Sequence, residues 1–218
     1  MGHTETAYLN SETYGFGFDD LKKYNRGWVL SAIRFEIKTF PQWRDTIVVR
    51  TWPSGCSKLF AFRDFLVEDG EGNVILRATS NWVLLNIENR TPSRMSDLHE
   101  PLPTNTEKQA LEGHPKRLNR ANYEQGELIH SLEVPYSAID INGHVNNTQY
   151  FAWTLDALRK CGVDLKTSCK IEATYMSEVF EGDTVEFYKL DREDGLFVFA
   201  ERKGDEGGDV FAVQILFD

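Results

Sequence analysis

Hydrophobic and β-branched residues gather in two long blocks of the chain, residues 28–87 and residues 127–217. In both blocks, short apolar runs alternate with turns rich in Asp, Gly and Asn, which is typical of antiparallel β-structure. An acidic glycine turn at residues 68–73 joins two such runs and predicts a hairpin. For the first block the pattern predicts four strands, at residues 33–37, 45–52, 58–67 and 74–84.

The second block repeats the order of the first. Placing Asp183 over Asp45, a shift of 138 residues, also places Ile171 over Ile33. A second acidic glycine turn, at residues 205–209, and a final apolar strand then follow in the same order. A repeat in fixed order indicates one supersecondary unit used twice, and chance similarity between two meanders is the alternative. We interpret the pattern as a duplication.

In each half, a predicted helix precedes the repeated strands. Residues 146–160 place apolar side chains on one face, end in two basic residues, and are followed by Gly162 as a stop signal. A shorter equivalent is predicted at residues 4–14. If the two units match, the first lacks the opening strand that residues 132–134 supply to the second, so we expect the chain to begin inside its first domain.

A segment with little periodicity separates the two blocks. It contains Pro92, Pro101, Pro103 and Pro115 among mixed charges, and a segment of this kind is normally a linker. The sequence therefore predicts an α+β protein with a first domain at residues 1–90, a linker at 91–124 and a second domain at 125–218.

Composition limits the classes of partner. The 218 residues carry a formal net charge of −10, which disfavours nucleic acid and anionic membranes as partners. No apolar run approaches the roughly 18 residues of a membrane span, and no secretory signal is visible. The odd number of cysteines, without metal-ligand spacing, predicts free thiols in the cytoplasm and neither metal nor cofactor. The three are Cys56, Cys161 and Cys169.

The densest polar cluster lies between a predicted strand and the helix at residues 146–160. Asp140, Asn142 and His144 are spaced by two, so an extended segment would project all three to one side. Free N–H groups collect where the helix begins, and such groups stabilise a developing oxyanion. The structural alternative is a turn at residues 140–143 followed by Asn146 as N-cap. We favour a functional site, because carboxylate, amide and imidazole occur together.

The run from Asp140 to Trp153 resembles the signature of the acyl–acyl carrier protein (acyl-ACP) thioesterases, Asp-x-Asn-x-His-Val-Asn-Asn-x-x-Tyr-x-x-Trp. The resemblance, strongest to the bacterial branch, covers nearly the whole chain except the family's first strand. It implies a tandem (double) hotdog fold, in which each unit wraps a curved antiparallel sheet around a central helix. Segments in the first half that are also similar to the family are residues 28–31, 52–55, 62–65 and 78–84.

The resemblance also implies a carboxylate in a Tyr-x-x-Glu segment, here Tyr175 to Glu178. Under the 138-residue shift Glu178 falls over Phe40, and the first unit has no equivalent of the Asp, Asn and His set. One unit is then expected to perform chemistry and the other to shape a lipid pocket, although Glu178 as an exposed sheet residue is an alternative. Candidates for the pocket, with ordinary core packing as the alternative, are Trp28, Phe60, Phe62 and Trp82.

Some members of the family carry a cysteine directly after this glutamate. Here the position is Val179, which cannot act as a nucleophile. The expected mechanism is therefore attack by water, with Glu178 as general base or as a holder of the water together with His144. Asn142 would polarise the thioester carbonyl, and Asp140 would orient Asn142 and His144. The sequence leaves open how Glu178 and His144 divide the proton transfer.

The resulting hypothesis is an enzyme of fatty acid biosynthesis that hydrolyses acyl-ACP to a free fatty acid. An acyl-CoA thioesterase of the same fold and a non-catalytic acyl-binding hotdog protein are the alternatives. Because acyl carrier proteins are acidic, docking needs a local basic cluster, and Lys116, Arg117 and Arg120 form the best one, with residues 159–160 as a second. A solvated surface is the alternative for both clusters. A homodimer of tandem chains also remains open.

Overall fold

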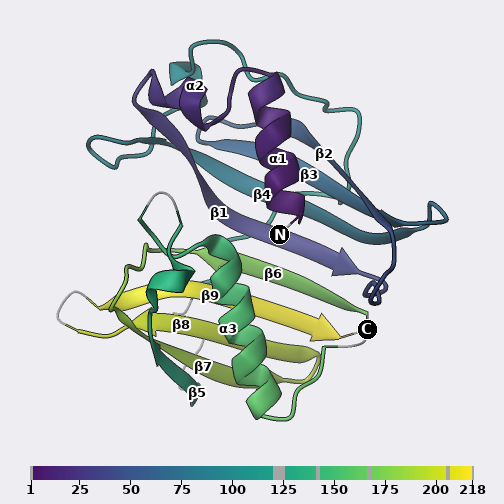
Figure 1. Cartoon of the computed structure of the whole chain (residues 1–218), viewed down its shortest axis with the longest axis vertical. Coiled ribbons are helices and arrows are strands. Elements are labelled where there is room, and N and C mark those ends of the chain that lie inside the picture. The colour runs from purple at the N-terminus through teal and green to yellow at the C-terminus, as the bar shows by residue number, and fades with distance from the viewer. Residues whose placement is uncertain (1, 120–125, 141–142, 166–167, 205–206, 218) are drawn as a thin grey trace. The chain divides into compact units, whose positions relative to one another are not determined.

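The computed structural model describes residues 2–119, 126–140, 143–165, 168–204 and 207–217, and for residues 2–5 the backbone alone. The chain divides into two compact units, Met1–Pro115 and Lys116–Asp218. Each unit combines one antiparallel sheet with one long helix (Figure 1).

The N-terminal unit contains a four-stranded sheet in the order β2-β3-β4-β1. Helix α1 lies across one face of this sheet (Figure 1), where Ala7 packs against Phe65 and Ala78. The elements of this unit are α1 (Gly2–Thr13), α2 (Phe18–Lys22), β1 (Arg26–Ile37), β2 (Ile47–Cys56), β3 (Phe60–Asp69), β4 (Val74–Asn86) and η1 (Met95–Asp97).

The C-terminal unit contains a five-stranded sheet in the order β6-β9-β8-β7-β5. Its helix α3 lies across the sheet (Figure 1), with Tyr150, Trp153 and Leu158 buried. The elements of this unit are β5 (Glu127–Glu133), η3 (Tyr136–Ala138), α3 (Asn147–Lys160), β6 (Cys169–Tyr175), β7 (Thr184–Arg192), β8 (Gly195–Arg202) and β9 (Gly208–Phe217).

The predicted duplication is confirmed by the strand order. Strands β2-β3-β4-β1 of the first unit correspond to β7-β8-β9-β6 of the second, and each set follows a helix along the chain. Strand β5 adds to the edge of β7, and among the described residues no strand adds to the corresponding edge of β2.

Both predicted ends of the long helix in the second unit are confirmed. The side chain of Asn146 accepts a hydrogen bond from the Thr148 backbone N–H (3.0 Å), which makes Asn146 the N-cap of α3. After the helix, Gly162 adopts a φ of +79°, and the N–H of Val163 returns to the carbonyl of Leu158 (3.0 Å). A left-handed glycine with this return bond ends the helix.

The segment between the two sheets is bound to the first unit up to Pro115, inside the predicted linker. The carboxylate of Asp64 is buried and accepts hydrogen bonds from Ser54 Oγ (2.9 Å) and from the backbone N–H of Ala110 (2.7 Å). The indole of Trp52 donates to the carbonyl of Lys108 (2.8 Å). Backbone bonds add to these contacts, since the N–H of Ser93 donates to the carbonyl of Leu84 (2.7 Å) and the N–H of Asn105 donates to the carbonyl of Pro53 (2.8 Å). Backbone and side-chain groups of the sheet together therefore satisfy the polar backbone groups of this segment.

We expect Asp64→Ala to destabilise the protein by about 1–3 kcal/mol, because the Ala110 N–H and the Ser54 hydroxyl lose a buried acceptor. The free energy of unfolding is measured by denaturant titration. Glu100→Ala, at an exposed position of the same segment, is the control and changes stability by less than about 0.5 kcal/mol. Equal effects of the two substitutions would contradict the role of Asp64.

Candidate active site

Of the predicted polar cluster, Asp140 and His144 are brought together by a reversal of the chain and not by an extended segment. The Asp140 N–H donates to the carbonyl of His144 (2.8 Å), and the Gly143 N–H donates to the carbonyl of Asp140 (3.0 Å). Gly143 has a φ of +79°, which reverses the chain. The expectation of an extended segment is therefore wrong, because the backbone bonds close a turn ahead of the N-cap Asn146. The functional role of the polar side chains stays a prediction. The turn sets Asp140 directly beside His144.

The predicted carboxylate and imidazole lie close together. His144 Nδ1 and Glu178 Oε1 are 3.7 Å apart, and the side chains are 22% and 36% exposed. This separation exceeds a direct hydrogen bond, and it places both groups within reach of one water molecule or one reacting oxygen. Of the four predicted catalytic residues, the structure brings Asp140, His144 and Glu178 to one end of the second unit, and Asn142 lies outside the described residues.

Backbone hydrogen bonds bind the two segments that carry this pair. The N–H of Val145 donates to the carbonyl of Val179 (2.9 Å), so the residue after His144 is bound to the residue after Glu178. The Tyr175 hydroxyl donates to the carbonyl of Asn147 (3.1 Å) and connects the end of β6 to the first turn of α3. The distance between imidazole and carboxylate is therefore set by the backbone on both sides of the pair.

An aromatic ring that the sequence pattern did not indicate contacts the imidazole. Phe180 lies 5.2 Å from His144 between ring centroids, in an edge-on arrangement with an interplanar angle of 72°. The ring is 42% exposed, which is unusual for a phenylalanine. Its position two residues after Glu178 is the one sequence signal that could have indicated it.

Buried Tyr150 and half-buried Tyr175 pack together beside the start of α3. Burial raises the pKa of Tyr150 and of Tyr175 above the usual range, so both hydroxyls stay neutral at physiological pH. Their rings meet edge-on at 5.7 Å, and both contact Phe211 of β9. This packing gives the start of α3 an apolar support.

The position after the glutamate offers no nucleophile. Val179 is fully buried and its side chain is a hydrocarbon. Cys56 and Cys161 are exposed free thiols, and Cys169 is a buried free thiol at the start of β6. None of the three is adjacent in sequence to the turn or to Glu178.

The four aromatic candidates for the acyl pocket have other contacts. The Trp28 indole donates to the carbonyl of Phe16 (3.2 Å), and the Trp82 indole donates to Ser80 Oγ (2.9 Å). Phe62 stacks on His114, and Phe60 is partly buried at the start of β3. None of the four lines the apolar cavity of their unit, and their assignment to the substrate remains a prediction.

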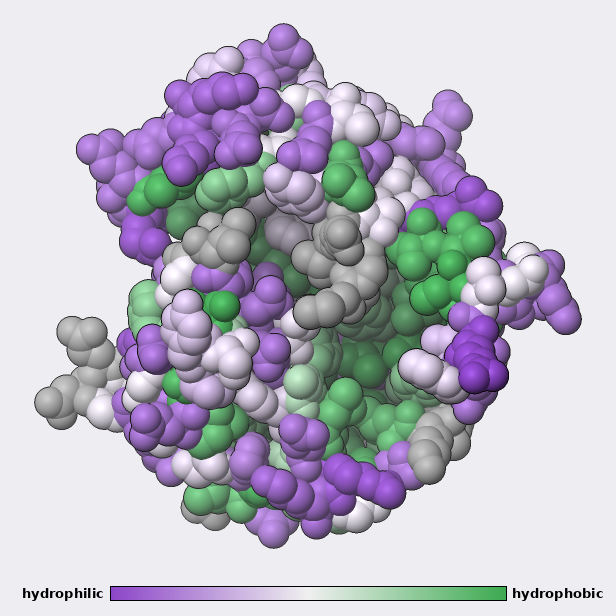
Figure 2. All heavy atoms as spheres, in the orientation of Figure 1, coloured by the Kyte–Doolittle hydropathy of each residue, from purple (hydrophilic) through white to green (hydrophobic). Residues whose placement is uncertain are grey.

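That cavity has a volume of about 240 Å³ and lies on the helix-covered face of the first sheet. Figure 2 shows hydrophobic residues gathered on the right of the view. Ile47 and Val48, at the start of β2, are exposed. The alternation of apolar residues on β1 to β4 indicates this face. The residues lining the cavity are Ile33, Phe35, Ile37, Thr39, Phe40, Pro41, Ile47, Val49, Phe65, Val67, Ile75, Leu76 and Ala78.

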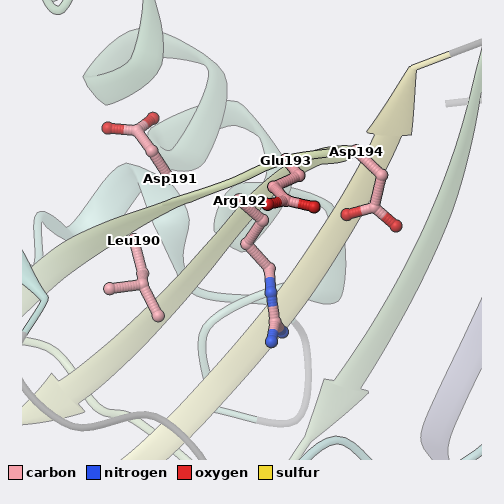
Figure 3. Close-up of a pocket in the computed structure, with 5 residues that line it drawn as sticks. All are labelled: Leu190, Asp191, Arg192, Glu193 and Asp194. Atoms are coloured by element: carbon pink, nitrogen blue, oxygen red, sulfur yellow. The ribbon is translucent and has the colours of Figure 1, made fainter.

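A second hollow, of about 520 Å³, is formed by the turn between β7 and β8 alone. The side chains of its five residues point in different directions (Figure 3), and Asp191 is paired with Lys189 (2.7 Å). The hollow includes none of the predicted site residues, so we assign it to the shape of the turn. Its residues are Leu190, Asp191, Arg192, Glu193 and Asp194.

Within the described ranges, no group of three or more His, Cys, Asp or Glu side chains is arranged to hold a metal ion. Among the same residues, no helix is long and apolar enough to cross a membrane.

The predicted docking residues begin the second unit. Lys116 and Arg117 are exposed, and Arg120 lies outside the described residues. The Lys116 backbone N–H donates to Glu172 (2.5 Å), and the N–H of buried Leu118 donates to Thr174 Oγ1 (3.0 Å). These bonds hold the segment along β6. In the second basic cluster, Arg159 pairs with Asp164 (3.0 Å).

Two family models match the chain. The acyl-ACP thioesterase N-terminal domain matches residues 3–100, and the acyl-ACP thioesterase C-terminal domain matches residues 121–218. The chain belongs to the acyl-ACP thioesterase family. The resemblance found in the sequence is thereby confirmed.

Among curated relatives, a chloroplastic acyl-[acyl-carrier-protein] hydrolase of Cuphea viscosissima is 29% identical over 183 residues, which cover 82% of this chain and 44% of that protein. The chain thus spans less than half of that relative's length. An acyl-ACP thioesterase structure from Bacteroides thetaiotaomicron is 27% identical in sequence and superposes with a TM-score of 0.74. The matched region covers 97% of this chain and 85% of that one.

The fold is confirmed by two further structures. The 12:0-ACP thioesterase of Umbellularia californica superposes with a TM-score of 0.81 at 21% sequence identity. The matched region covers 98% of this chain and 86% of that one. A Mycobacterium tuberculosis protein described as a double hotdog fold superposes with a TM-score of 0.52 at 14% identity, over 86% of this chain and 74% of its own. The predicted α+β tandem hotdog fold is correct.

Proposed function

We propose that this protein is an acyl-ACP hydrolase that releases free fatty acid in fatty acid biosynthesis. The observation that carries the proposal is the pair of His144 Nδ1 and Glu178 Oε1, 3.7 Å apart beside the start of α3, in a chain of the acyl-ACP thioesterase family. A carboxylate and an imidazole at this separation are suited to activating a water molecule.

In the proposed reaction, Glu178 takes a proton from water, and the oxygen attacks the thioester carbonyl carbon. Asn142 donates a hydrogen bond to the carbonyl oxygen, where negative charge grows. The C–S bond then breaks, and the proton held by Glu178 passes through His144, 3.7 Å away, to the departing thiolate, which restores both groups. Asp140 orients the other two through the turn, because its backbone N–H binds the carbonyl of His144 (2.8 Å). No group of the protein becomes covalently attached to the acyl chain.

We also propose a division of labour between the units. The second unit performs the hydrolysis, and the first holds the acyl chain in its apolar cavity of about 240 Å³. An apolar cavity suits this role, since each buried methylene contributes about 0.8 kcal/mol to the free energy of binding. Contacts with the part of the acyl group outside the cavity remain proposed for Trp28, Phe60, Phe62 and Trp82. The free thiols are consistent with a cytoplasmic protein, which stays a proposal, as does a homodimer.

The test compares one acyl group on two carriers. Purified protein is given lauroyl-ACP and lauroyl-CoA, and release of free fatty acid is followed with time. We expect kcat/KM to be higher for the ACP substrate. A preference for CoA would support the acyl-CoA alternative, and binding without any turnover would support the non-catalytic one.

Carrier docking is proposed to depend on Lys116, Arg117 and Arg120. Reversing all three to Glu should raise KM for acyl-ACP about tenfold, because three exposed charges each contribute up to about 1 kcal/mol. KM for a small soluble thioester should change little. Added salt should weaken the wild-type interaction, since exposed charges are screened within about 8–10 Å.

Reversal of Lys22, Lys23 and Lys58, which are exposed on the first unit, is the matched control for total charge. We expect this triple variant to leave KM for acyl-ACP within about twofold of the wild type. If both triple variants raise KM equally, net charge rather than a docking cluster governs the interaction.

A further inference from the structure

The helix-covered face of the first sheet is arranged in three rows of side chains set by strand register. The first row is Ile37, Leu76, Val67 and Val49. The second row is Phe35, Ala78, Phe65 and Thr51. The third row is Ile33, Ser80, Arg63 and Pro53. All residues of the first two rows except Thr51 line the cavity, whereas the third row contributes only Ile33.

The cavity has an exposed rim and a buried end. Thr39, Pro41 and Ile47 line it beside the first row and are exposed. At the second row, Phe65 is 4% exposed and Ala78 is 1% exposed, and Ala7 of α1 packs on both. A chain that enters at the rim therefore meets the ring of Phe65 as it approaches the third row.

Behind Phe65 the face becomes polar. Arg63 is 9% exposed, and its guanidinium donates to Asn10 Oδ1 (2.8 Å), Ser11 Oγ (2.9 Å) and Thr51 Oγ1 (3.2 Å). These acceptors are neutral oxygens, and burial lowers the pKa of Arg63 to about 10, so the group stays charged at neutral pH. An alkyl chain pushed past Phe65 would disrupt this network and leave a buried charge without its hydrogen bonds, which is strongly unfavourable.

We infer that Phe65 and Ala78, backed by Arg63, set the maximum length of the acyl chain, and that the substrate is a medium-chain acyl group. The inference rests on the proposed function. At roughly 30 Å³ for a group the size of a water molecule, the cavity of about 240 Å³ takes about eight methylene-sized groups. With the thioester carbon and the first one to three methylenes outside the cavity, about eight enclosed groups correspond to a decanoyl or dodecanoyl group, and the tails of palmitoyl and stearoyl groups exceed the cavity.

The test measures kcat/KM on ACP substrates carrying even-numbered acyl chains from hexanoyl to stearoyl. The wild type should be fastest with decanoyl or dodecanoyl. Phe65→Ala should move the optimum to acyl groups longer by roughly two to four carbons, because it removes a six-carbon ring, with about fourfold in relative kcat/KM per methylene newly buried. Ala78→Val should move the optimum the other way.

Adding Arg63→Met to Phe65→Ala tests the polar end. If the guanidinium stops the chain, the double variant should accept still longer acyl groups than Phe65→Ala alone. An identical length profile for the single and double variants would remove Arg63 from the inference.

The second unit supplies a matched control. Phe199 is paired with Ala212 as Phe65 is paired with Ala78, and it packs in a filled cluster with Leu118 and Phe197. Phe199→Ala should lower stability without changing the rank order of chain lengths. Where Phe65→Ala fails to fold, Phe65→Leu and competition binding of decanoic against palmitic acid replace it.

The outcomes separate this inference from the proposed function. A wild-type optimum at palmitoyl, or an unchanged rank order in active Phe65 variants, would overturn the medium-chain inference and leave the hydrolase intact. An equal shift in Phe199→Ala would also overturn it. Absence of hydrolysis at every chain length would instead overturn the proposed function, and binding of decanoic acid in preference to palmitic acid would still support the cavity's length limit.

Discussion

Glu178→Gln and His144→Ala are each expected to lower kcat by roughly 10²–10⁴, the range for losing a positioned general acid or base. Such losses correspond to about 3–5 kcal/mol of transition-state stabilisation. The glutamine keeps the shape of Glu178 and removes its basicity, so KM should change little. Single-turnover hydrolysis of acyl-ACP measures the chemical step directly.

The control for this result is a variant in which Cys56, Cys161 and Cys169 are all replaced by Ser. Since the position after Glu178 is the buried Val179, we expect this variant to fold and to keep near wild-type turnover. Circular dichroism and thermal unfolding check that each variant is folded. Full activity of Glu178→Gln, or loss of activity in a folded cysteine variant, would show that hydrolysis does not proceed by attack of water activated at Glu178.

The strands and their order could be predicted from the sequence because their signal is local. Alternating apolar residues and glycine-rich acidic turns define each strand, and the 138-residue shift relates β2 to β7 and β1 to β6. The ends of α3 were equally local, since Asn146 and Gly162 act within one turn of the helix.

The geometry of the site could not be predicted, because it depends on contacts between residues distant in sequence. The spacing by two of Asp140, Asn142 and His144 suggested an extended segment, but pairing of Ile139 with Val145 closes the chain into a turn. The distance from His144 to Glu178 depends on the bond between Val145 and Val179, which no periodicity encodes. Phe180 reaches the imidazole through the same pairing.

The cavity shows a further limit of pattern reasoning. Phe65 opposite Ala78 and Phe199 opposite Ala212 are the same pair of residue types on corresponding strands. The first pair lines a cavity of about 240 Å³, and the second packs in a filled cluster with Leu118. The two pairs occupy different faces, since Phe211, the residue before Ala212, contacts Tyr150 and Phe151 of α3, whereas Phe65 packs against Ala7 of α1. Whether such a pair lines a cavity therefore depends on its face and on the side chains that neighbouring elements contribute.

Asn142→Ala is expected to lower kcat by about 10²–10³, because it removes a donor aimed at charge that grows on the thioester oxygen. The turn should survive the change, since its closing bonds run between backbone groups of Asp140, Gly143 and His144. Thermal stability should therefore stay near the wild-type value, and KM should change less than kcat.

Asn147→Ala is the matched control for Asn142→Ala, because it truncates an amide at the first residue of α3 while keeping the backbone N–H groups of the helix start. We expect it to retain most activity, since the carbonyl of Asn147, not its side chain, accepts the Tyr175 hydroxyl. An acyl trifluoromethyl ketone, whose hydrate mimics the tetrahedral intermediate, should bind the Asn142 variant more weakly by about the factor that kcat loses. Equal losses in both asparagine variants, or undiminished kcat in Asn142→Ala, would assign oxyanion stabilisation to the helix N–H groups instead of Asn142.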